Sequence, residues 1–483
     1  MSPYLIAGIF LVYTALLFLI TWITARKADS QSFFTGNRAS PWFVVAFGMI
    51  GASLSGVTFM SVPGWVSETQ FTYMLVVFGY LAGYFVIALV LLPLYYRLQL
   101  TSIYTYLEKR LGSWSYRTGA GFFLLSRTLV TSLRMFLVIN VLQLFVFDAW
   151  SMPFWLNALV FIILAVLYTF RGGIRTIIWT DTLQTGFMLL AVVLSMVFIS
   201  RELDAGFGSL VMEIRRAGMS KMFVTDWHHE RYYLKQFLSG MFITITMTGL
   251  DQEMMQKNLS CRNIREARKN MFTFSGILIL VNFLFLLLGA FLVLYADKRG
   301  ISVASSDDLF PTIAFKYMSP LAGIVFLTGL ISAAFPSADG ALTSLTTSVS
   351  IDFLRLDRRE DLTEKKATGI RYIVHLSAAI LIFACIMIFR IVNDRAVIDM
   401  LFTLVSYSYG PLLGLYTFGL FTRRKARDRL TPLIAVLSPV ICYFLSENSV
   451  LLLNGYRFGF ELIFLNGFLT FAGLLAFSRT KAD

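Results

Sequence analysis

The stretch PWFVVAFGMIGASLSGVTFMSVPG, residues 41–64, has the length of a membrane-spanning helix but carries many residues that weaken a helix. One interpretation is a packing face, because glycine and serine let two helices approach closely. The other is a discontinuous helix, whose freed carbonyl oxygens can coordinate a cation in mid-membrane. The small, hydroxyl and proline residues are Gly48, Gly51, Ser53, Ser55, Gly56, Thr58, Ser61 and Pro63.

A second apolar segment, 236–250, is interrupted in the same way by Gly240, Thr244, Thr246, Thr248 and Gly249. If apolar runs are counted along the chain, 41–65 is the second span and 236–250 the seventh. Five spans separate their starts, and an odd number gives the two halves opposite topology. The pattern predicts a five-plus-five inverted repeat with broken second and seventh helices, in which interrupted segments at matching positions mark a binding site.

Composition places the whole chain in a membrane. Of 483 residues, 57% are hydrophobic and 14% charged, more apolar surface than a soluble core can use. A β-barrel is disfavoured, because the apolar runs are long and do not alternate. We predict an all-α polytopic membrane protein with about 13 transmembrane helices, at 3–24, 41–65, 72–96, 118–147, 153–170, 174–200, 236–250, 271–296, 319–352, 371–391, 396–421, 431–446 and 460–478.

The spans group into five regions. Residues 1–35 form an extra N-terminal helix and loop, 36–200 the first repeat, 201–235 an external loop with room for a short surface helix, 236–430 the second repeat, and 431–483 the last two helices and a cytoplasmic tail.

Orientation follows from the basic residues. Alternate loops hold 27 of the 41 Lys and Arg residues, namely 25–39, 97–117, 171–175, 251–270, 353–371, 422–430 and 479–483. Because cytoplasmic loops are enriched in Lys and Arg, we expect the N-terminus outside and the C-terminus inside the cell (inner) membrane. The same bias accounts for the net charge of +13 without a nucleic-acid partner. The first span lacks a basic segment before it, which indicates a retained helix and not a cleaved signal peptide.

Other classes of protein fit the sequence less well. There is no Walker motif for ATP-driven pumping, and the three cysteines form no CxxC pair. An intramembrane enzyme needs a His/Glu metal site or paired aspartates, and neither is found, so we expect no enzyme and no cofactor. A channel favours a continuous polar stripe, and a sensor normally adds a signalling domain.

Five motifs together resemble the sodium/solute symporter family, whose members share the leucine-transporter fold. They occur in the family's order over roughly residues 40–425. The motifs are LQLTSIYTYLEKRLG (98–112), GGIRTIIWTDTLQTG (172–186), GLDQEMMQKNLSCRNIREARK (249–269), ISAAFPSADGALTSLTTSVSIDF (331–353) and SYSYGPLLGLYTFGLF (406–421).

The resemblance implies a sodium site built by the second and ninth spans. Its members fall here at Gly51, Leu54, Ala333, Pro336 and Ser337. Pro336 stands where the family usually has a hydroxyl residue, so one ligand is lost. A proline frees the carbonyl four residues back, here that of Ser332, which offers a replacement.

Ionisable residues inside spans usually mark function. Asp181 is either part of a second cation site or a helix-end acid paired with a loop arginine. Asp339 binds a cation, carries a proton, pairs with a basic group, or hydrogen-bonds neighbouring hydroxyls. Arg127 and Arg134 share one helical face and either pair with an intramembrane acid or hold a substrate carboxylate; Arg127 resembles the carboxylate-binding position of sialic acid transporters.

These residues predict sodium-coupled symport of a small polar organic solute, a carboxylate such as sialic acid or a sugar. The alternative is a proton-coupled symporter or a uniporter, because Pro336 removes a sodium ligand. The partners expected are the solute, sodium as the coupling ion and the lipid bilayer, with a monomer as the functional unit. Candidate substrate-binding residues are Ser53, Ser55, Thr58, Arg127, Thr244 and Tyr407.

Overall fold

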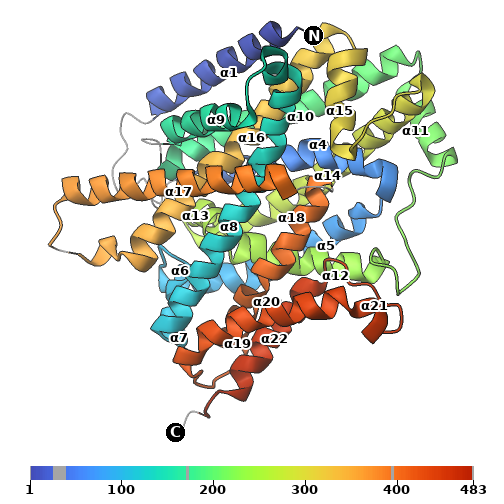
Figure 1. Ribbon diagram of the computed structural model, residues 1–483. Coiled ribbons are helices and arrows are strands. Elements are labelled where there is room, and N and C mark those ends of the chain that lie inside the picture. Colours follow the sequence, from blue (N-terminus) through green and yellow to red (C-terminus); the bar gives the residue numbers. More distant parts are fainter. Residues whose placement is uncertain (1, 25–39, 170–172, 360, 393–395, 481–483) are drawn as a thin grey trace.

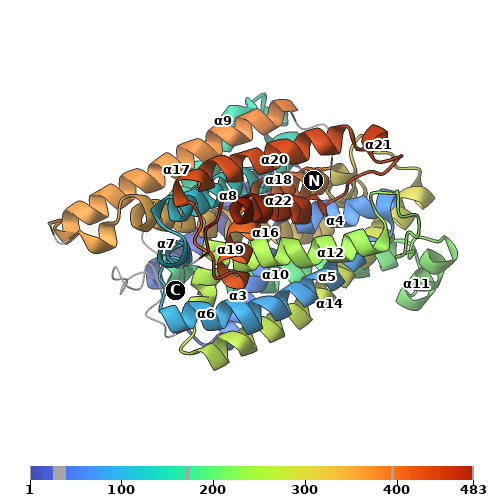
Figure 2. The ribbon, with the colours of Figure 1, turned by 90° about the horizontal axis from the view of Figure 1, so that it is seen from below.

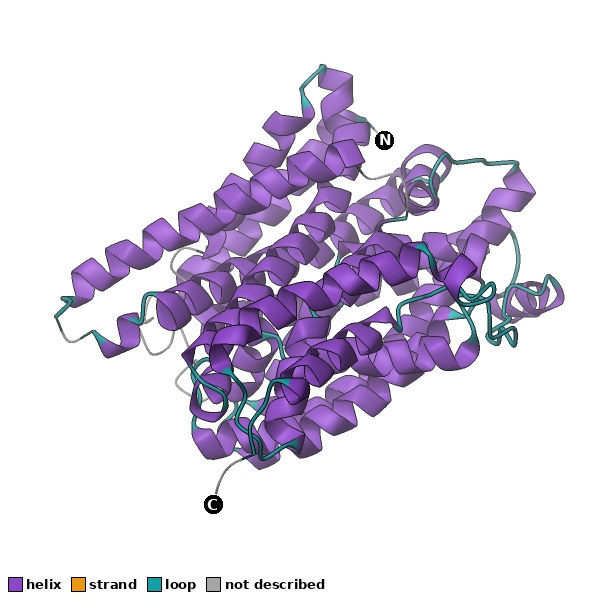
Figure 3. Cartoon of the chain, turned by 60° about the horizontal axis from the view of Figure 1, so that its bottom comes forward, coloured by secondary structure: helices purple, strands orange, loops and turns teal. Residues whose placement is uncertain are grey.

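The chain is helical throughout the part that the computed structural model describes, residues 2–24, 40–169, 173–359, 361–392 and 396–480 (Figures 1 and 3). Within these ranges there is no β-strand, only two isolated bridges, Ser40–Cys261 and Lys425–Arg479. This confirms the predicted all-α class.

Each predicted span overlaps a helix or at least the first helix of a pair. In chain order these are α1 (Pro3–Thr24), α3 (Trp42–Ser53) with α4 (Gly56–Thr69), α5 (Tyr73–Val86) with α6 (Leu92–Leu98), α8 (Ser113–Leu142), α9 (Phe154–Thr169), α10 (Gly173–Glu202), α12 (Tyr233–Thr244) with α13 (Gln252–Leu259), α14 (Ile264–Arg299), α16 (Pro320–Ser348), α17 (Glu364–Val392), α18 (Val397–Ser408) with α19 (Gly410–Phe421), α20 (Thr431–Glu447) and α22 (Leu462–Ala476). The short helices between them are α7 (Thr105–Arg110), α11 (Phe207–Arg216), α15 (Leu309–Thr312) and α21 (Ser449–Leu452).

The number of spans stays a prediction. Among the described residues, 8 helices are long and apolar enough to cross a membrane, or 10 if each bent pair is one span. Two shorter apolar helices, Phe154–Leu167 and Leu462–Ala476, match further predicted spans. Helix α12, which covers most of the seventh predicted span, is short, as its sequence indicated.

The predicted break in the second span is present. Helices α3 and α4 meet at an angle of 57°, and between them Leu54 has extended backbone angles. A similar bend of 42° separates α18 from α19 at Tyr409 and was not expected from the sequence.

The break in the seventh span differs from its prediction. The helix does not end in a cytoplasmic loop at residue 251. A π-helical turn, Ile245–Gly249, leads into α13, and every residue from Gln252 to Leu259 is buried. The expectation that 251–270 is a loop was therefore wrong for its first part, because Asp251 caps a new helix by accepting hydrogen bonds from the N–H groups of Glu253 and Met254.

Helix α16 lies at the centre of the bundle, between α10, α8 and α1 (Figures 1 and 2). Its residues from Phe326 onward are nearly all buried, which explains the small side chains of this segment. The Tyr13 hydroxyl of α1 lies 2.6 Å from the Ser332 hydroxyl of α16, so the extra N-terminal helix is held to the centre by a polar contact.

Two of the sequence motifs contact each other. The side-chain amide of Gln252 donates to the Thr101 carbonyl at 2.8 Å, and its oxygen accepts from the Ile103 N–H at 3.0 Å. One glutamine thus ties the start of α13 to the loop after α6. This contact gives the TSIY and DQ segments a shared structural role.

Candidate transport site

A cavity of about 90 Å³ lies at the break between α3 and α4. It brings together most of the predicted substrate-binding residues, which come from three separate parts of the chain: Ser53, Ser55, Thr58, Arg127 and Thr244. Tyr407 lines a different, polar pocket with Trp65 and Ser446, so the structure does not bring it to the others.

The cavity contains hydroxyl groups that the sequence analysis did not single out. Tyr73, Tyr80 and Tyr84 of α5 line it, and the Tyr73 and Tyr80 hydroxyls lie 3.0 Å apart. Their spacing of seven and four residues places them on one helical face, a signal that was available in the sequence. Tyrosines give the cavity an apolar wall with hydrogen-bonding tips.

Two arginines of α8 line the same cavity but are in different electrostatic situations. Arg127 forms an ion pair with Glu253 and lies 3.6 Å from Asp251. Arg134 donates only to the Ala52 carbonyl, at 3.4 Å, and among the described residues no carboxylate lies within ion-pair distance of it. Of the two guanidinium groups in the cavity wall, that of Arg134 is the one without a carboxylate partner among the described residues.

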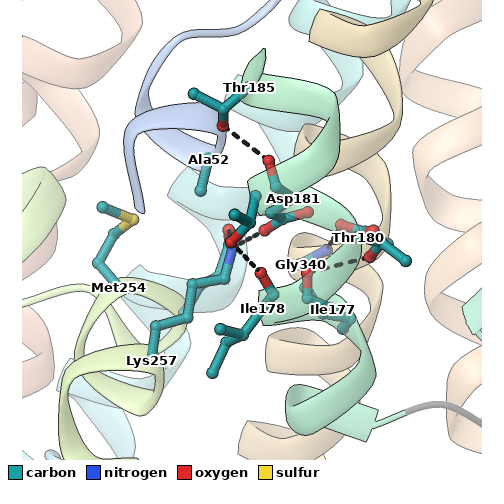
Figure 4. Close-up of polar contacts among 12 residues, drawn as sticks. Ala52, Ile177, Ile178, Thr180, Asp181, Thr185, Met254, Lys257 and Gly340 are labelled. Carbon is teal, nitrogen blue, oxygen red and sulfur yellow. Dashed lines mark hydrogen bonds and ion pairs between the residues drawn. The ribbon is translucent and has the colours of Figure 1, made fainter. Parts of the chain in front are cut away.

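From Glu253 the ion pairs continue to Lys257 and Asp181, and Figure 4 shows the Lys257–Asp181 pair. Lys257 Nζ of α13 lies 2.7 Å from Asp181 Oδ2 of α10 and 3.4 Å from Glu253 Oε1. All three side chains are at most 1% exposed. The predicted intramembrane acid Asp181 is thus paired, with a lysine of the broken helix.

The surroundings of Glu253 fix its position. A Cβ atom at Gly340 of α16 would overlap the Glu253 carboxylate, so only glycine leaves room for it there. The neighbouring acid, Asp251, accepts a hydrogen bond from the Tyr409 hydroxyl at 2.8 Å. Arg127, Glu253, Lys257 and Asp181, here called the ion-pair chain, therefore link α8, α13 and α10 next to α16.

The two helix breaks differ in what happens to their backbone oxygens. At the second break, the Tyr95 and Tyr104 hydroxyls donate to the carbonyls of Gly249 and Leu250, at 2.8 and 2.9 Å. At the first break, α3 ends at Ser53, and the last carbonyls of a helix have no helical amide partner. Of these, the Ala52 carbonyl accepts from Arg134.

The ninth-span residues of the implied sodium site are all buried in α16. Ala333 and Pro336 lie within a helix that the proline does not interrupt, since α16 runs from Pro320 to Ser348. The Ser337 hydroxyl is buried and has no hydrogen-bond partner among the described residues. Such an unsatisfied oxygen is costly unless a ligand or ion satisfies it.

Asp339 follows half a turn later. Its Oδ1 accepts from the Gly340 N–H at 2.5 Å, while the buried Oδ2 has no partner among the described residues. The charges of Asp181 and Lys257 act on it. Among the described residues, Asp339 therefore accepts from a backbone N–H and not from the neighbouring hydroxyls that the sequence suggested.

Gly51 marks how closely α3 approaches α10. A Cβ atom at Gly51 would overlap Thr185 Oγ1. That hydroxyl is held in place because it donates to the Asp181 and Phe47 carbonyls. Gly51 therefore allows close packing of α3 against α10, although it also lies near the break of the helix. The two alternatives raised by this stretch both apply, at different residues.

One buried acidic residue holds the segment before α15 to the start of α18. Asp307, in the loop before α15, is buried, and its Oδ2 accepts from the Val397 N–H at the start of α18, at 2.9 Å. Burial raises the pKa of Asp307 from 3.8 to about 6.

Sequence reasoning missed Glu253 and Lys257 because they were assigned to a loop. Their i, i+4 spacing after Asp251, a residue type that caps helices, was the available signal for a helix. What no local pattern contains is that this helix is buried against Asp181, 76 residues away.

A bundle with two broken helices meeting at a polar cavity is the architecture of a secondary transporter. Solved structures share this fold. A sodium-coupled sialic acid symporter in a substrate-bound outward-open state matches with a TM-score of 0.83 at 17% identity, over 98% of this chain and 99% of the other. The transporter Mhp1 of the nucleobase-cation-symport-1 family matches with a TM-score of 0.56 at 12% identity, over 92% and 93%.

The family model of the sodium:solute symporter family matches residues 33–428, and the chain belongs to this family. Among its relatives is a sodium/sialic acid symporter of Aliivibrio fischeri, 22% identical over 90% of this chain and 86% of the relative. A sodium/sialic acid symporter of Proteus mirabilis is 23% identical over 86% and 84%. A mouse sodium-coupled monocarboxylate transporter is 22% identical over 86% and 68%. The protein is a multi-pass membrane transporter that carries a small organic solute with sodium, as the sequence predicted.

Proposed function

We propose that this symporter carries a small organic anion with one carboxylate, which binds to Arg134. The observation that carries the proposal is the guanidinium of Arg134, buried, without a carboxylate partner, and facing a cavity lined by hydroxyls. A guanidinium offers a planar pair of donors that matches a carboxylate. Arg127, the residue expected from the resemblance, is already paired with Glu253.

The size of the cavity favours a short solute. Its volume of about 90 Å³ is below the roughly 150 Å³ of a protein cavity that accepts benzene. A carboxylate with a stem of a few carbons fits this space, whereas a nine-carbon sugar acid requires the cavity to enlarge. The relatives include transporters named for both kinds of substrate.

For the coupling ion we propose sodium, held by carbonyl oxygens of Gly51, Leu54 and Ala333 and by the Ser337 hydroxyl. Sodium is a hard cation and is satisfied by such oxygens. The first break supplies carbonyls without helical donors, and Ser337 supplies the unpartnered hydroxyl. Pro336 has no amide hydrogen, so the Ser332 carbonyl is a further oxygen that can replace the missing side-chain ligand.

The coupling ion is tested by uptake of labelled butyrate and related short carboxylates into proteoliposomes. We expect uptake to require an inward sodium gradient. Ser337→Ala should raise the sodium concentration for half-maximal uptake, while Ser344→Ala should leave it unchanged. Ser344 is the matched control, because its buried hydroxyl already donates to the Ala341 carbonyl. An equal effect of the two substitutions contradicts the site.

A second candidate is proton coupling, favoured by the unpartnered Oδ2 of Asp339. Uptake driven by a proton gradient without sodium, and abolished by Asp339→Asn, establishes that alternative and replaces the sodium assignment.

For the cellular setting we propose the inner membrane, with the N-terminus outside, and a monomeric transport unit without a cofactor. The burial of Lys257 removes one residue from the basic side, which leaves 26 against 12 in the opposite loops and span ends, so the bias is retained. Protease accessibility of tags at the two ends in right-side-out vesicles tests this orientation.

A further inference from the structure

The ion-pair chain contains a carboxylate, that of Glu253, which contacts a guanidinium that lines the cavity. Arg127 and Arg134 are seven residues apart on α8 and both line the cavity, about 10 Å apart along the helix axis. Two such guanidinium groups on one wall would suit a ligand with two carboxylates. Only one of them is available, because Glu253 neutralises the other from within the protein.

We infer that Glu253 is a specificity-determining residue that limits the substrate to a single negative charge. It acts as a tethered counter-anion for Arg127 and thereby excludes dicarboxylates from the site. This inference rests on the proposed function in that it takes Arg134 as the receptor of the substrate carboxylate.

Three observations support the role of Glu253. Its carboxylate is 1% exposed and contacts Arg127 on one side and Lys257 on the other. Gly340 provides the space it occupies. Arg127 is 2% exposed, and its two terminal nitrogens already face the carboxylates of Asp251 and Glu253.

Electrostatics explains why a dicarboxylate is rejected. Its second carboxylate would have to displace Glu253 or lie beside it without a counter-charge. A buried, unpaired carboxylate costs several kcal/mol, and like charges at close range add to that cost. A monocarboxylate avoids both the cost of an unpaired buried charge and the repulsion from Glu253, because its only charge pairs with Arg134.

Replacing the glutamate should change the charge that the site accepts. In Glu253→Gln, Arg127 keeps only the 3.6 Å contact to Asp251 and becomes available to a ligand. A charge-assisted hydrogen bond contributes roughly 1.5–3 kcal/mol, so dicarboxylate affinity should rise about tenfold or more.

The experiment uses thermal stabilisation and uptake by the full-length protein in sodium buffer. The ligands are dicarboxylates of three to five carbons and their monoamides, which have the same size but one charge. We expect wild type to bind monoamides and not dicarboxylates, and Glu253→Gln to bind both. Arg127→Gln/Glu253→Gln is the control, which lacks the released guanidinium and should gain no dicarboxylate.

Each outcome bears on the inference. It is overturned if folded Glu253→Gln gains no dicarboxylate, or if the double variant gains it equally. If Glu253→Gln does not fold, the double variant is measured instead, because it removes both charges of the pair together. Loss of monoamide binding in the double variant would make Arg127 a substrate ligand and would refute the inference. If wild type binds neither kind of carboxylate and Arg134→Gln changes nothing, the proposed function fails instead.

Discussion

Lys257→Met should destabilise the folded protein more than any surface charge substitution. Lys257 Nζ lies 2.7 Å from Asp181 and 3.4 Å from Glu253, and all three groups are buried. At an effective dielectric constant of 20, the two attractions amount to about 6 and about 5 kcal/mol, which offset the desolvation of the ammonium group. Removal of the lysine leaves two buried carboxylates with less compensation.

The net loss is estimated from buried ion pairs in general, where removing one partner costs about 3 to 5 kcal/mol. With an unfolding entropy of about 2.1 cal/mol/K per residue, this loss lowers the unfolding midpoint of a 483-residue chain by roughly 3 to 5 °C. Thermal unfolding of the detergent-purified protein, followed by tryptophan fluorescence, measures the change.

Two further variants make this prediction specific. Lys257→Met/Asp181→Asn removes an opposite charge as well and should regain part of the lost stability. Lys298→Met breaks an exposed 2.8 Å pair with Glu213 and should shift the midpoint by less than about 1 °C, because surface pairs contribute little. The prediction is wrong if Lys257→Met has the same unfolding midpoint as the wild type, or if the double variant has as low a midpoint as Lys257→Met.

Two other regions of the fold provide tests of the same kind. The pKa of Asp307 is raised to about 6 in the folded protein, so the folded state binds this proton more tightly than the unfolded state, and stability should fall as pH rises from about 4 to 6. Asp307→Asn should therefore raise the unfolding midpoint at pH 7.5 and not at pH 4, since asparagine still accepts from the Val397 N–H; an equal shift at both pH values contradicts the assignment. Gly79→Ala should destabilise by at least about 1 to 3 kcal/mol in the same assay, because its Cβ would overlap the Phe237 backbone carbonyl of α12. Gly121→Ala on α8 meets open space and is the matched control, which should be neutral or slightly stabilising; equal effects of the two would show that α5 and α12 are not closely packed.

The fold could be predicted because its signals are local. Apolar runs, the glycines of 41–64 and the polar interruption near Thr244 are visible within single segments. The boundary error at residue 251 has a physical cause. A polar segment normally indicates a loop in a membrane protein, but here the charges of α13 are satisfied by Arg127 and Asp181 from distant helices. Partners so far apart in the sequence leave no periodic pattern.

The candidate site was predictable in part for the same reason. Ser53, Ser55, Thr58 and Thr244 lie at the breaks, where local sequence reveals exposed backbone and hydroxyls, and the structure brings them to one cavity. The choice between Arg127 and Arg134 depends on which of them has a counter-charge, and only the three-dimensional position of Glu253 decides it. The assignment of the substrate carboxylate to Arg127, which the resemblance implies, stays a prediction beside the proposal of Arg134.

Charge balance around the cavity gives sodium coupling a physical basis. With every group charged, the buried residues here carry three positive and four negative charges, from Arg127, Arg134, Lys257 and from Asp181, Asp251, Glu253, Asp339. An excess of one negative charge attracts a cation and opposes an anionic substrate. A bound sodium ion cancels that excess, so the substrate carboxylate enters a site where Arg134 is no longer outweighed. By linkage, the factor by which sodium raises substrate affinity equals the factor by which substrate raises sodium affinity. In that charge state sodium and a substrate carboxylate favour each other's binding, and the tethered Glu253 contributes by making the unoccupied site more negative.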